Sequence, residues 1–421
     1  MLEFHLGLAV DMTSDGHAHH DTPRWLLALL LAALGMLGPF AVDTYIPAFP
    51  TIASDLGASA LQMQQTFSVY LIGFAVMFLF HGALSDSFGR KPIILWGLGV
   101  FLVGTVGCAL STTIGQLLFF RLLQGVSVGA GMVVGRAMIR DLYADADAQR
   151  LMSMVTMWFG IAPALAPIIG GFLFSHYGWH SIFWFVAVFT LALVLMSVFA
   201  FHETLAVEKR QSFRLQPLLA GYREVGVNVP FLLLSFAAGF NFNGFFLYIL
   251  SAPVFLPQHL HLGPTEYAWL FIPGIGGIMT GAFISGRVAG RWSSAKTVRA
   301  GYSIMMLAVL ANIIFSTFFT PAIPWSVMPI FIYAIGTATA FPSLSLLVMD
   351  LFPFRRGMAT SLSAFVGGMI NALVAGVISP ALSHSPALLA WGMGAMMLCG
   401  IFCWMGYRRV VRQAMRRKVD T

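Results

Sequence analysis

The segment "WLLALLLAALGMLGPFAVDTYIPAFP" (Trp25–Pro50) decides the fold class of this chain. From Trp25 to Val42 it holds no charged side chain, and a helix of about 20 apolar residues is what crosses a lipid bilayer. Similar apolar blocks recur along all 421 residues, of which 58% are hydrophobic and 9% are charged. A soluble domain typically has about 25% charged residues. The pattern predicts an all-α polytopic membrane protein.

The apolar blocks predict twelve transmembrane helices in two halves. The longest hydrophilic stretch, from His202 to Asn228, separates six blocks from six. Halves of matching length indicate a repeat with pseudo-twofold symmetry and a substrate site between the halves near the midplane. The expected spans are 25–47, 61–81, 92–110, 115–136, 150–174, 180–201, 230–254, 266–289, 299–319, 324–349, 357–381 and 386–407. The expected organisation is a cytoplasmic tail (1–24), a six-helix half (25–201), a cytoplasmic linker (202–229), a second six-helix half (230–407) and a basic cytoplasmic tail (408–421).

The net charge of +7 reflects membrane topology. All of the 23 Lys and Arg residues except Arg121 fall on one side of the map of spans. The positive-inside rule therefore places both termini in the cytoplasm of a multi-pass protein, which we expect in the bacterial inner membrane. The lipid bilayer, and not a nucleic acid, is the expected partner of this basic chain. Residues 1–22 lack the basic n-region of a cleaved signal peptide.

The sequence contains no signature of an enzyme. It has no HExxH motif, no paired carboxylates and no nucleophile with a base, and the absence of a Walker A sequence argues against ATP as the energy source. The hydrophilic parts are too short for the sensing domain of a receptor. We therefore expect a chain that is not an enzyme, with no metal and no cofactor other than a proton gradient. Nothing demands an oligomer, so a monomer is expected.

Two charged residues at membrane depth are the candidates for proton coupling. Arg121 lies about six residues inside the fourth span and Asp43 about four residues inside the first, so at roughly 1.5 Å per residue they have a similar depth. A guanidinium there costs at least ~2.5–3.5 kcal/mol and nearly always faces the bundle interior with a partner. We expect a pair or a shared polar cavity in which Asp43 takes up and releases a proton. Two alternatives stay open: Arg121 snorkels outward or forms a fixed ion pair, and Asp43 is a wetted acid at a helix end.

Several polar and aromatic side chains in the spans are candidates for substrate contact. A drug cavity needs apolar and aromatic walls with a few polar anchors, and amides that face lipid would be costly. For the aromatic residues the alternative is ordinary helix packing, and for Asn241 and Asn243 it is hydrogen bonding between helices. The candidates are Tyr45, Gln65, Tyr70, Gln124, Asn241, Asn243, Tyr248 and Asn371.

The stretch "GALSDSFGRKP" (Gly82–Pro92) after the second span resembles the signature of the major facilitator superfamily, G-x-L-x-D-x-x-G-R-[KR]. Gly82 and Gly89 permit close helix approach and a tight turn. Asp86 can meet helix N-termini or basic side chains, and Arg90 fixes the cytoplasmic side. The resemblance implies the major facilitator fold and a gating role for these four residues.

Two further stretches resemble motifs of drug/proton antiporters. They are "RLLQG" (Arg121–Gly125) and "GIAPALAPIIGG" (Gly160–Gly171), in which Ala166 stands where the motif prefers glycine. Small residues and prolines allow close packing and a bend at the interface between halves. With "DTYIPAFP" in the first span and "RDLYA" after the fourth, the chain resembles the Bcr/CflA drug-resistance subfamily. The antiporter-motif residues are Pro163, Pro167, Gly170 and Gly171.

This resemblance implies a proton-coupled efflux transporter that exports amphipathic antibiotics, such as amphenicols or bicyclomycin, by alternating access. It implies Asp43 and Arg121 as the residues that couple proton and substrate. The specific motifs are confined to the first half, because Arg287 stands at the position that corresponds to Asp86. The alternative is a carrier of the same fold that takes up or exports a metabolite.

Overall fold

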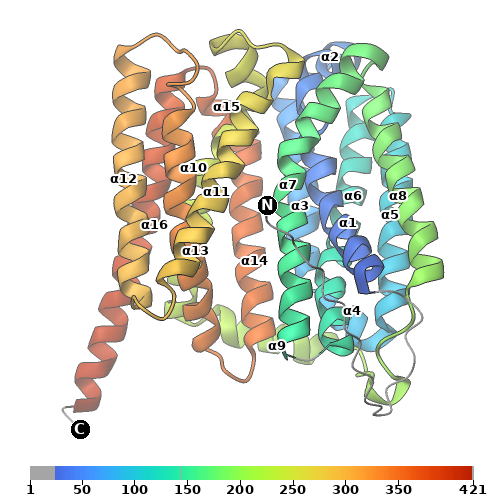
Figure 1. The fold of residues 1–421 in the computed structure, drawn as a ribbon, viewed down its shortest axis with the longest axis vertical. Helices are drawn as coiled ribbons and strands as arrows, with labels where there is room; N and C mark the ends of the chain where they lie inside the picture. The colour runs from blue at the N-terminus through green and yellow to red at the C-terminus, as the bar shows by residue number, and fades with distance from the viewer. Residues whose placement is uncertain (1–23, 144, 420–421) are drawn as a thin grey trace, which may run out of the picture.

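The computed structural model describes residues 24–143 and 145–419, and every regular element in these ranges is a helix (Figure 1). The expected tail at 1–24 lies outside the described residues except for Arg24, where the first helix begins. Eleven helices are long and apolar enough to cross a membrane, and α3 (Ala60–Phe78) and α4 (His81–Phe88) make a twelfth span that is bent by 49°. The predicted all-α membrane protein with twelve spans is confirmed when this bent pair counts as one span.

The first half contains α1 to α8. Its first predicted span is not one continuous helix, because α1 ends at Asp43 and a 3-10 turn follows. Pro47 has no backbone N–H to donate to the Asp43 carbonyl, so the α-helical ladder stops there. The remaining bounds are η1 (Ile46–Ala48), α2 (Phe49–Asp55), α5 (Arg90–Ala109), α6 (Ile114–Leu142), α7 (Asp145–Tyr177) and α8 (His180–Ala200), after α1 (Arg24–Asp43).

The second half contains α10 to α16, after a linker that holds η2 and α9. The last span, α16, continues to Val419, so residues that were expected to form a separate basic tail extend this helix away from the bundle (Figure 1). The bounds are η2 (Val207–Lys209), α9 (Leu215–Gly226), α10 (Val229–Val254), η3 (Phe255–His259), η4 (Pro264–Glu266), α11 (Ala268–Val288), α12 (Ser294–Phe318), α13 (Met328–Asp350), α14 (Arg356–Leu373), η5 (Val374–Ile378), α15 (Ser379–Leu382) and α16 (Pro386–Val419).

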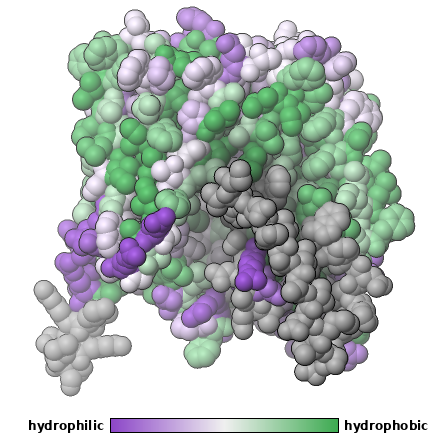
Figure 2. Space-filling model, in the orientation of Figure 1, coloured by the Kyte–Doolittle hydropathy of each residue, from purple (hydrophilic) through white to green (hydrophobic). Residues whose placement is uncertain are grey.

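The two halves stand side by side, and the seam between them is formed mainly by α3 against α14 and by α7 against α11 (Figure 1). Where the visible face is coloured, apolar side chains cover most of its middle, and hydrophilic ones lie along its upper and lower edges (Figure 2). The lower end in Figure 1 holds α4 and α9, and we call it the basic end, because Arg90 follows α4, Arg140 lies in the last turn of α6 and Arg355 precedes α14. The other end, where α2 lies, is called the opposite end.

Glycines set the position of the helices that carry the buried polar residues. A Cβ atom on Gly125 of α6 would lie 2.1 Å from the Tyr70 carbonyl oxygen of α3, and one on Gly73 would lie 2.9 Å from the Val126 nitrogen. Only the missing side chains allow these two backbones to touch, which is how small residues bring membrane helices together. As a result Tyr70 of α3 lies beside the buried face of α6.

Candidate functional site

Arg121 is fully buried inside the first half, with an exposed fraction of 0%. Its Nη1 atom donates to the Ala41 carbonyl oxygen at 2.8 Å and to Gln124 Oε1 at 2.7 Å. The guanidinium carbon lies 4.5 Å from the ring centroid of Tyr45 and 4.5 Å from that of Tyr70. A cation between two aromatic faces is attracted by both rings. Arg121 therefore points into the bundle and does not snorkel.

The side chains around Arg121 are themselves held by hydrogen bonds. Gln124 Nε2 donates to Thr105 Oγ1 of α5 at 2.8 Å, and the Tyr45 hydroxyl shares a hydrogen bond of 2.9 Å with Thr66 Oγ1 of α3. These partners fix the orientation of the amide and of the phenol ring. Three spans thus contribute to one buried polar group, which we call the Arg121 cluster and define as Tyr45, Tyr70, Gln124 and Arg121, and a fourth span, α5, supports it through Thr105.

Asp43 lies beside this cluster without joining it. It is 5% exposed, and no described residue forms a hydrogen bond with its carboxyl group or an ion pair with it within 4.0 Å. The Nε and Nη2 atoms of Arg121 have no hydrogen-bond partner among the described residues. In this conformation Asp43 and Arg121 do not form the fixed ion pair that sequence analysis left open.

The antiporter motif in α7 packs directly on the turn that follows Asp43. A Cβ atom on Gly170 would lie 1.8 Å from the Thr44 carbonyl oxygen, and one on Gly171 would lie 2.2 Å from the Pro264 carbonyl oxygen of the second half. Two consecutive glycines therefore touch the backbones of both halves. Pro163 and Pro167 lie inside the same helix. Through these two glycines, α7 packs against both the turn that follows Asp43 and the second half.

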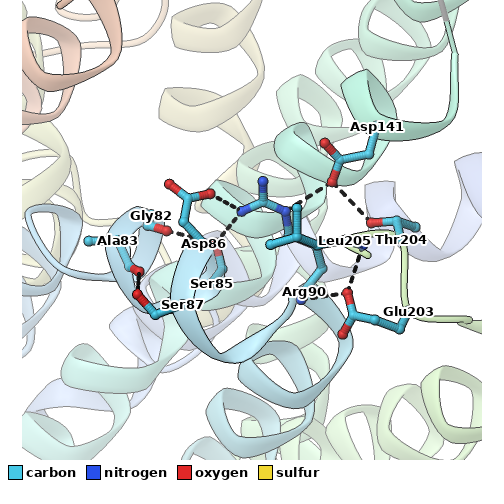
Figure 3. Close-up of polar contacts among 10 residues, drawn as sticks. All are labelled: Gly82, Ala83, Ser85, Asp86, Ser87, Arg90, Asp141, Glu203, Thr204 and Leu205. Carbon is cyan, nitrogen blue, oxygen red and sulfur yellow. Dashed lines mark hydrogen bonds and ion pairs between the residues drawn. The ribbon is translucent and has the colours of Figure 1, made fainter. Parts of the chain in front are cut away.

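The gating motif lies at the basic end, where Arg90 is held by two acids (Figure 3). Its Nη1 atom contacts Asp86 Oδ1 at 2.5 Å and Ser85 Oγ at 2.7 Å, and its Nε atom donates to Asp141 Oδ2 at 3.0 Å. Asp141 is near the end of α6, so the motif ties the loop between α4 and α5 to a second span. Gly82 begins this segment, and its carbonyl oxygen accepts from Ser85 Oγ at 2.9 Å.

Glu203, just after α8, completes this charged group. Its Oε1 atom accepts from the backbone nitrogen atoms of Arg90 and Leu205, each at 2.9 Å, and its Oε2 atom lies 3.7 Å from Arg210 Nη2. Gly89 has φ +101°, and a Cβ atom there would lie 2.3 Å from Glu203 Oε2. The glycine is required both by its backbone conformation and by this contact.

Sequence reasoning did not identify Asp141 or Glu203 as part of the gate. Both are acids in joints of the basic side, where nearly every other charge is positive. That contrast is the signal that could have marked them, because an acid among cations at a helix end is a natural ion-pair partner. Their pairing with the motif arginine depends on how α4, α6 and α8 end in space.

The structure separates the substrate candidates of the first half into two groups. Tyr45, Tyr70 and Gln124 belong to the Arg121 cluster. Gln65 is half-buried, and its side chain forms no hydrogen bond with a described residue. Its neighbour Gln64, which was not a candidate, donates from Nε2 to the Leu250 carbonyl oxygen of α10 at 3.1 Å and so bridges the halves.

The candidates of the second half also point in two directions. Asn243 Nδ2 donates to Asn371 Oδ1 of α14 at 2.7 Å. Asn241 Nδ2 donates to the Tyr302 hydroxyl at 3.0 Å, and the Tyr248 hydroxyl accepts from Asn312 Nδ2 at 2.7 Å. These last two bonds lead into α12, within the second half. Of the four candidates, Asn243 and Asn371 therefore lie on the side of α14, the helix that contacts α3 of the first half.

Two six-helix halves with a buried polar cluster near their seam are the architecture of membrane transporters that work by alternating access. The chain belongs to the Major Facilitator Superfamily, whose family model matches residues 30–375. The resemblance stated from the sequence motifs is thereby confirmed. This is a family of carriers and not of enzymes.

Similar proteins agree with this assignment. The chain is 31% identical over 378 residues to the uncharacterized MFS-type transporter YdgK of Bacillus subtilis, a match that covers 89% of this chain and 92% of the relative. It is 27% identical to a bicyclomycin resistance protein homolog of Haemophilus influenzae, covering 90% and 95%. It is 29% identical to the multidrug resistance protein MdtL of Escherichia coli, covering 78% and 82%.

The fold is also that of solved structures. A bacterial homolog of the human lysosomal transporter Spinster superposes with a TM-score of 0.71 over 93% of this chain and 98% of that one. The sequence identity is 18%, so this likeness shows the fold alone.

Proposed function

We propose that this chain is a proton-coupled exporter of amphipathic drugs in the bacterial inner membrane. The names of two relatives, a multidrug resistance protein and a bicyclomycin resistance protein homolog, support the substrate class. The gathering of basic residues at one end supports an orientation in which the basic end and both termini face the cytoplasm. Every residue of the proposed site comes from one chain, so a monomer is sufficient.

One observation carries the proton coupling: the buried carboxyl group of Asp43 has no hydrogen-bond or ion-pair partner among the described residues. Two nitrogen atoms of Arg121, Nε and Nη2, likewise have no hydrogen-bond partner among these residues. When Asp43 is ionised, its unpartnered carboxylate can accept a hydrogen bond from a donor group on the drug. When Asp43 takes up a proton, this acceptor is lost and the drug is released. Proton and drug then compete for the Asp43 carboxylate, which is the requirement for antiport.

The glycine contacts of α7 offer a route from protonation to movement of the halves. A shift of the Asp43 turn moves the Thr44 carbonyl oxygen, which lies against Gly170. The next residue, Gly171, lies against Pro264 of the second half. Because packed backbones cannot be compressed, a displacement at Asp43 is passed to the seam. We propose that this contact links the protonation state of Asp43 to alternating access.

The drug site proposed here lies between the Arg121 cluster and the Asn243–Asn371 pair. Asn371 precedes Ala372, whose carbonyl oxygen accepts from Ser68 Oγ of α3 at 2.8 Å. This bond places the amide pair close to the seam that α3 and α14 form. A site with aromatic rings and a cation on one side and amides on the other suits an amphipathic ligand. The Asp86–Arg90 group at the basic end is proposed as the cytoplasmic gate.

The deciding experiment is drug-driven proton movement in proteoliposomes that contain Asp43→Asn. We expect the variant to lose this movement, because an amide cannot carry the proton. Asp55→Asn is the matched control. Asp55 is the last residue of α2, and its Oδ2 atom accepts a hydrogen bond from Trp179 Nε1 at 2.9 Å. Unchanged antiport in Asp43→Asn, or equal loss in both variants, would remove the basis for Asp43 as the coupling acid.

A susceptibility panel distinguishes drug export from carriage of a metabolite. The chain is expressed in a bacterium that lacks its own drug pumps, and growth is measured with amphenicols and with bicyclomycin. Resistance that a protonophore abolishes is the expected result. A chain that confers no resistance to any compound, yet carries protons in response to a metabolite, would favour the alternative carrier.

A further inference from the structure

A crevice at the basic end of the first half is separate from the Arg121 cluster. It lies between α1, α6 and α7. Its walls are mostly apolar, its floor includes glycine backbone of α1 and α6, and one cation stands at its edge. The lining residues on which the argument depends are Leu31, Gly131, Gly135, Arg136, Ile139 and Val155.

Glycines create this crevice. A Cβ atom on Gly131 would lie 3.0 Å from Leu34 Cβ, and one on Gly135 would lie 3.0 Å from Leu31 Cδ2. The absent side chains therefore let α6 approach α1 closely and leave a floor of bare backbone along α6. An apolar channel of this kind accepts a hydrocarbon or aromatic group.

The cation at the edge has no partner among the described residues. Arg136 forms no hydrogen bond and no ion pair with any described residue, and the same holds for Arg140, one helical turn further along α6. The neighbouring acid, Asp141, is bound to Arg90 instead. Arg90, Arg150, Arg210 and Arg355 each pair with an acid, whereas Arg223 and Arg356, like Arg136 and Arg140, form no ion pair with a described residue. Two like charges one turn apart repel each other, so the pair is better satisfied when an anion is bound.

We propose that this crevice binds an amphiphile with an apolar body and an anionic head group. The apolar body lies on the glycine floor between Leu31, Ile139 and Val155, and the anion meets the guanidinium groups of Arg136 and Arg140. The planar guanidinium group of arginine can donate two parallel hydrogen bonds to a phosphate or carboxylate group. The site is distinct from the proposed drug site, because Arg136 lies on the order of 22 Å from Arg121 along the helix axis at about 1.5 Å per residue.

The test measures lipid adducts on the purified full-length protein by native mass spectrometry from a neutral detergent. Phosphatidylglycerol is the anionic probe and phosphatidylcholine is the zwitterionic comparison. The double variant Arg136→Gln, Arg140→Gln is expected to bind phosphatidylglycerol roughly 25-fold more weakly, at about fivefold per basic residue near an anionic head group. Its binding of phosphatidylcholine should not change. Arg150→Gln is the matched control, since it removes a charge of the same end that does not line the crevice.

Two further variants separate the crevice from general damage to the fold. The double variant Arg136→Lys, Arg140→Lys keeps both charges and is expected to keep most of the binding. Val155→Phe leaves the charges in place, fills the apolar wall and is expected to reduce binding. Equal phosphatidylglycerol binding by the wild type and the Arg136→Gln, Arg140→Gln variant would overturn the proposal. So would a loss that Arg150→Gln reproduces.

The anionic amphiphile could come from the bilayer or be a free compound, and a second arm separates these sources. Dodecyl phosphate replaces the lipid as the probe in the same measurement. Weaker binding of dodecyl phosphate than of phosphatidylglycerol assigns the site to a membrane lipid. Stronger binding of dodecyl phosphate assigns it to a free amphiphile. Binding of neither probe in an Arg136-dependent manner refutes the site. The proposal does not depend on drug transport, because Asp43→Asn is expected to leave this binding unchanged.

Discussion

A methyl group added at Gly170 should separate α7 from the turn that follows Asp43. In Gly170→Ala the new Cβ atom would lie 1.8 Å from the Thr44 carbonyl oxygen, whereas ordinary van der Waals contact begins at 3.4 Å. The neighbouring backbones must therefore move apart by 3.4 − 1.8 = 1.6 Å. The obstacle is a main-chain oxygen and not the end of a flexible side chain, so no rotamer change relieves it. Overpacking of this kind costs about 1–3 kcal/mol.

Gly160→Ala is the matched control for this prediction. Gly160 belongs to the same helix and the same motif, but a Cβ atom there would have no neighbour within 4 Å. The replacement of glycine by alanine within a helix is favourable by roughly 0.5–1 kcal/mol when there is space for the methyl group. The two variants therefore share the same change in composition and differ only in the contact.

The assay combines the thermal unfolding midpoint in detergent with the initial rate of drug transport in vesicles. Gly170→Ala is expected to lower both, since the displaced turn carries the proposed coupling acid. Gly160→Ala is expected to raise the midpoint slightly and to keep the transport rate. If the two variants show the same midpoint and the same rate, the contact between α7 and the Asp43 turn has no role in stability or transport.

Three further predictions concern the buried cation, the gate and the seam. Arg121→Lys keeps the charge, but a lysine ammonium group cannot lie flat between two tyrosine rings while it donates to two acceptors. The transport rate should therefore fall at least about tenfold, and a normal rate in vesicles would contradict this. Gly89→Ala should lower the unfolding midpoint, because φ is +101° at this position and the Cβ atom would lie 2.3 Å from Glu203 Oε2. Gly99→Ala is the control and should leave the midpoint unchanged, because a Cβ atom there has open space around it. Ser68→Ala removes the hydrogen bond between α3 and α14, which contributes about 0.5–1.5 kcal/mol. It should increase the reactivity of cysteines introduced at the opposite end of the seam, and unchanged reactivity would show that the bond does not hold the halves.

The twelve spans and the polar character of the site could be predicted from the sequence for a simple physical reason. A membrane helix must satisfy its backbone internally and present apolar side chains to lipid, so each span is marked by its own residues. For the same reason a charge such as Arg121 stands out within a span. The local chemistry of Pro47 also predicts where α1 ends, although sequence analysis had continued that span to residue 47.

The contacts of the site could not be predicted in this way, because they join residues that are far apart in the chain. The sequence predicts that Asp43 and Arg121 lie at a similar depth in the membrane. Depth alone, however, does not distinguish an ion pair between them from two side chains in one polar cavity. The structure shows that Arg121 donates to the Ala41 carbonyl oxygen and to Gln124, and that Asp43 has no partner among the described residues. Likewise, Asn241 and Asn243 differ in their partners because neighbouring positions on a helix face different spans.

The sequence by itself determined that the chain is a helical membrane protein of two halves, and its motifs pointed to the family. Those properties follow from hydrophobic length, charge asymmetry and short motifs, which are all local. Only the tertiary structure decided which residue binds which. Glycines at which a Cβ atom would lie less than 3 Å from a neighbouring backbone set the crossing of α3 with α6 and the packing of α7 on the Asp43 turn. Such contacts depend on the three-dimensional path of backbones that the sequence does not place side by side.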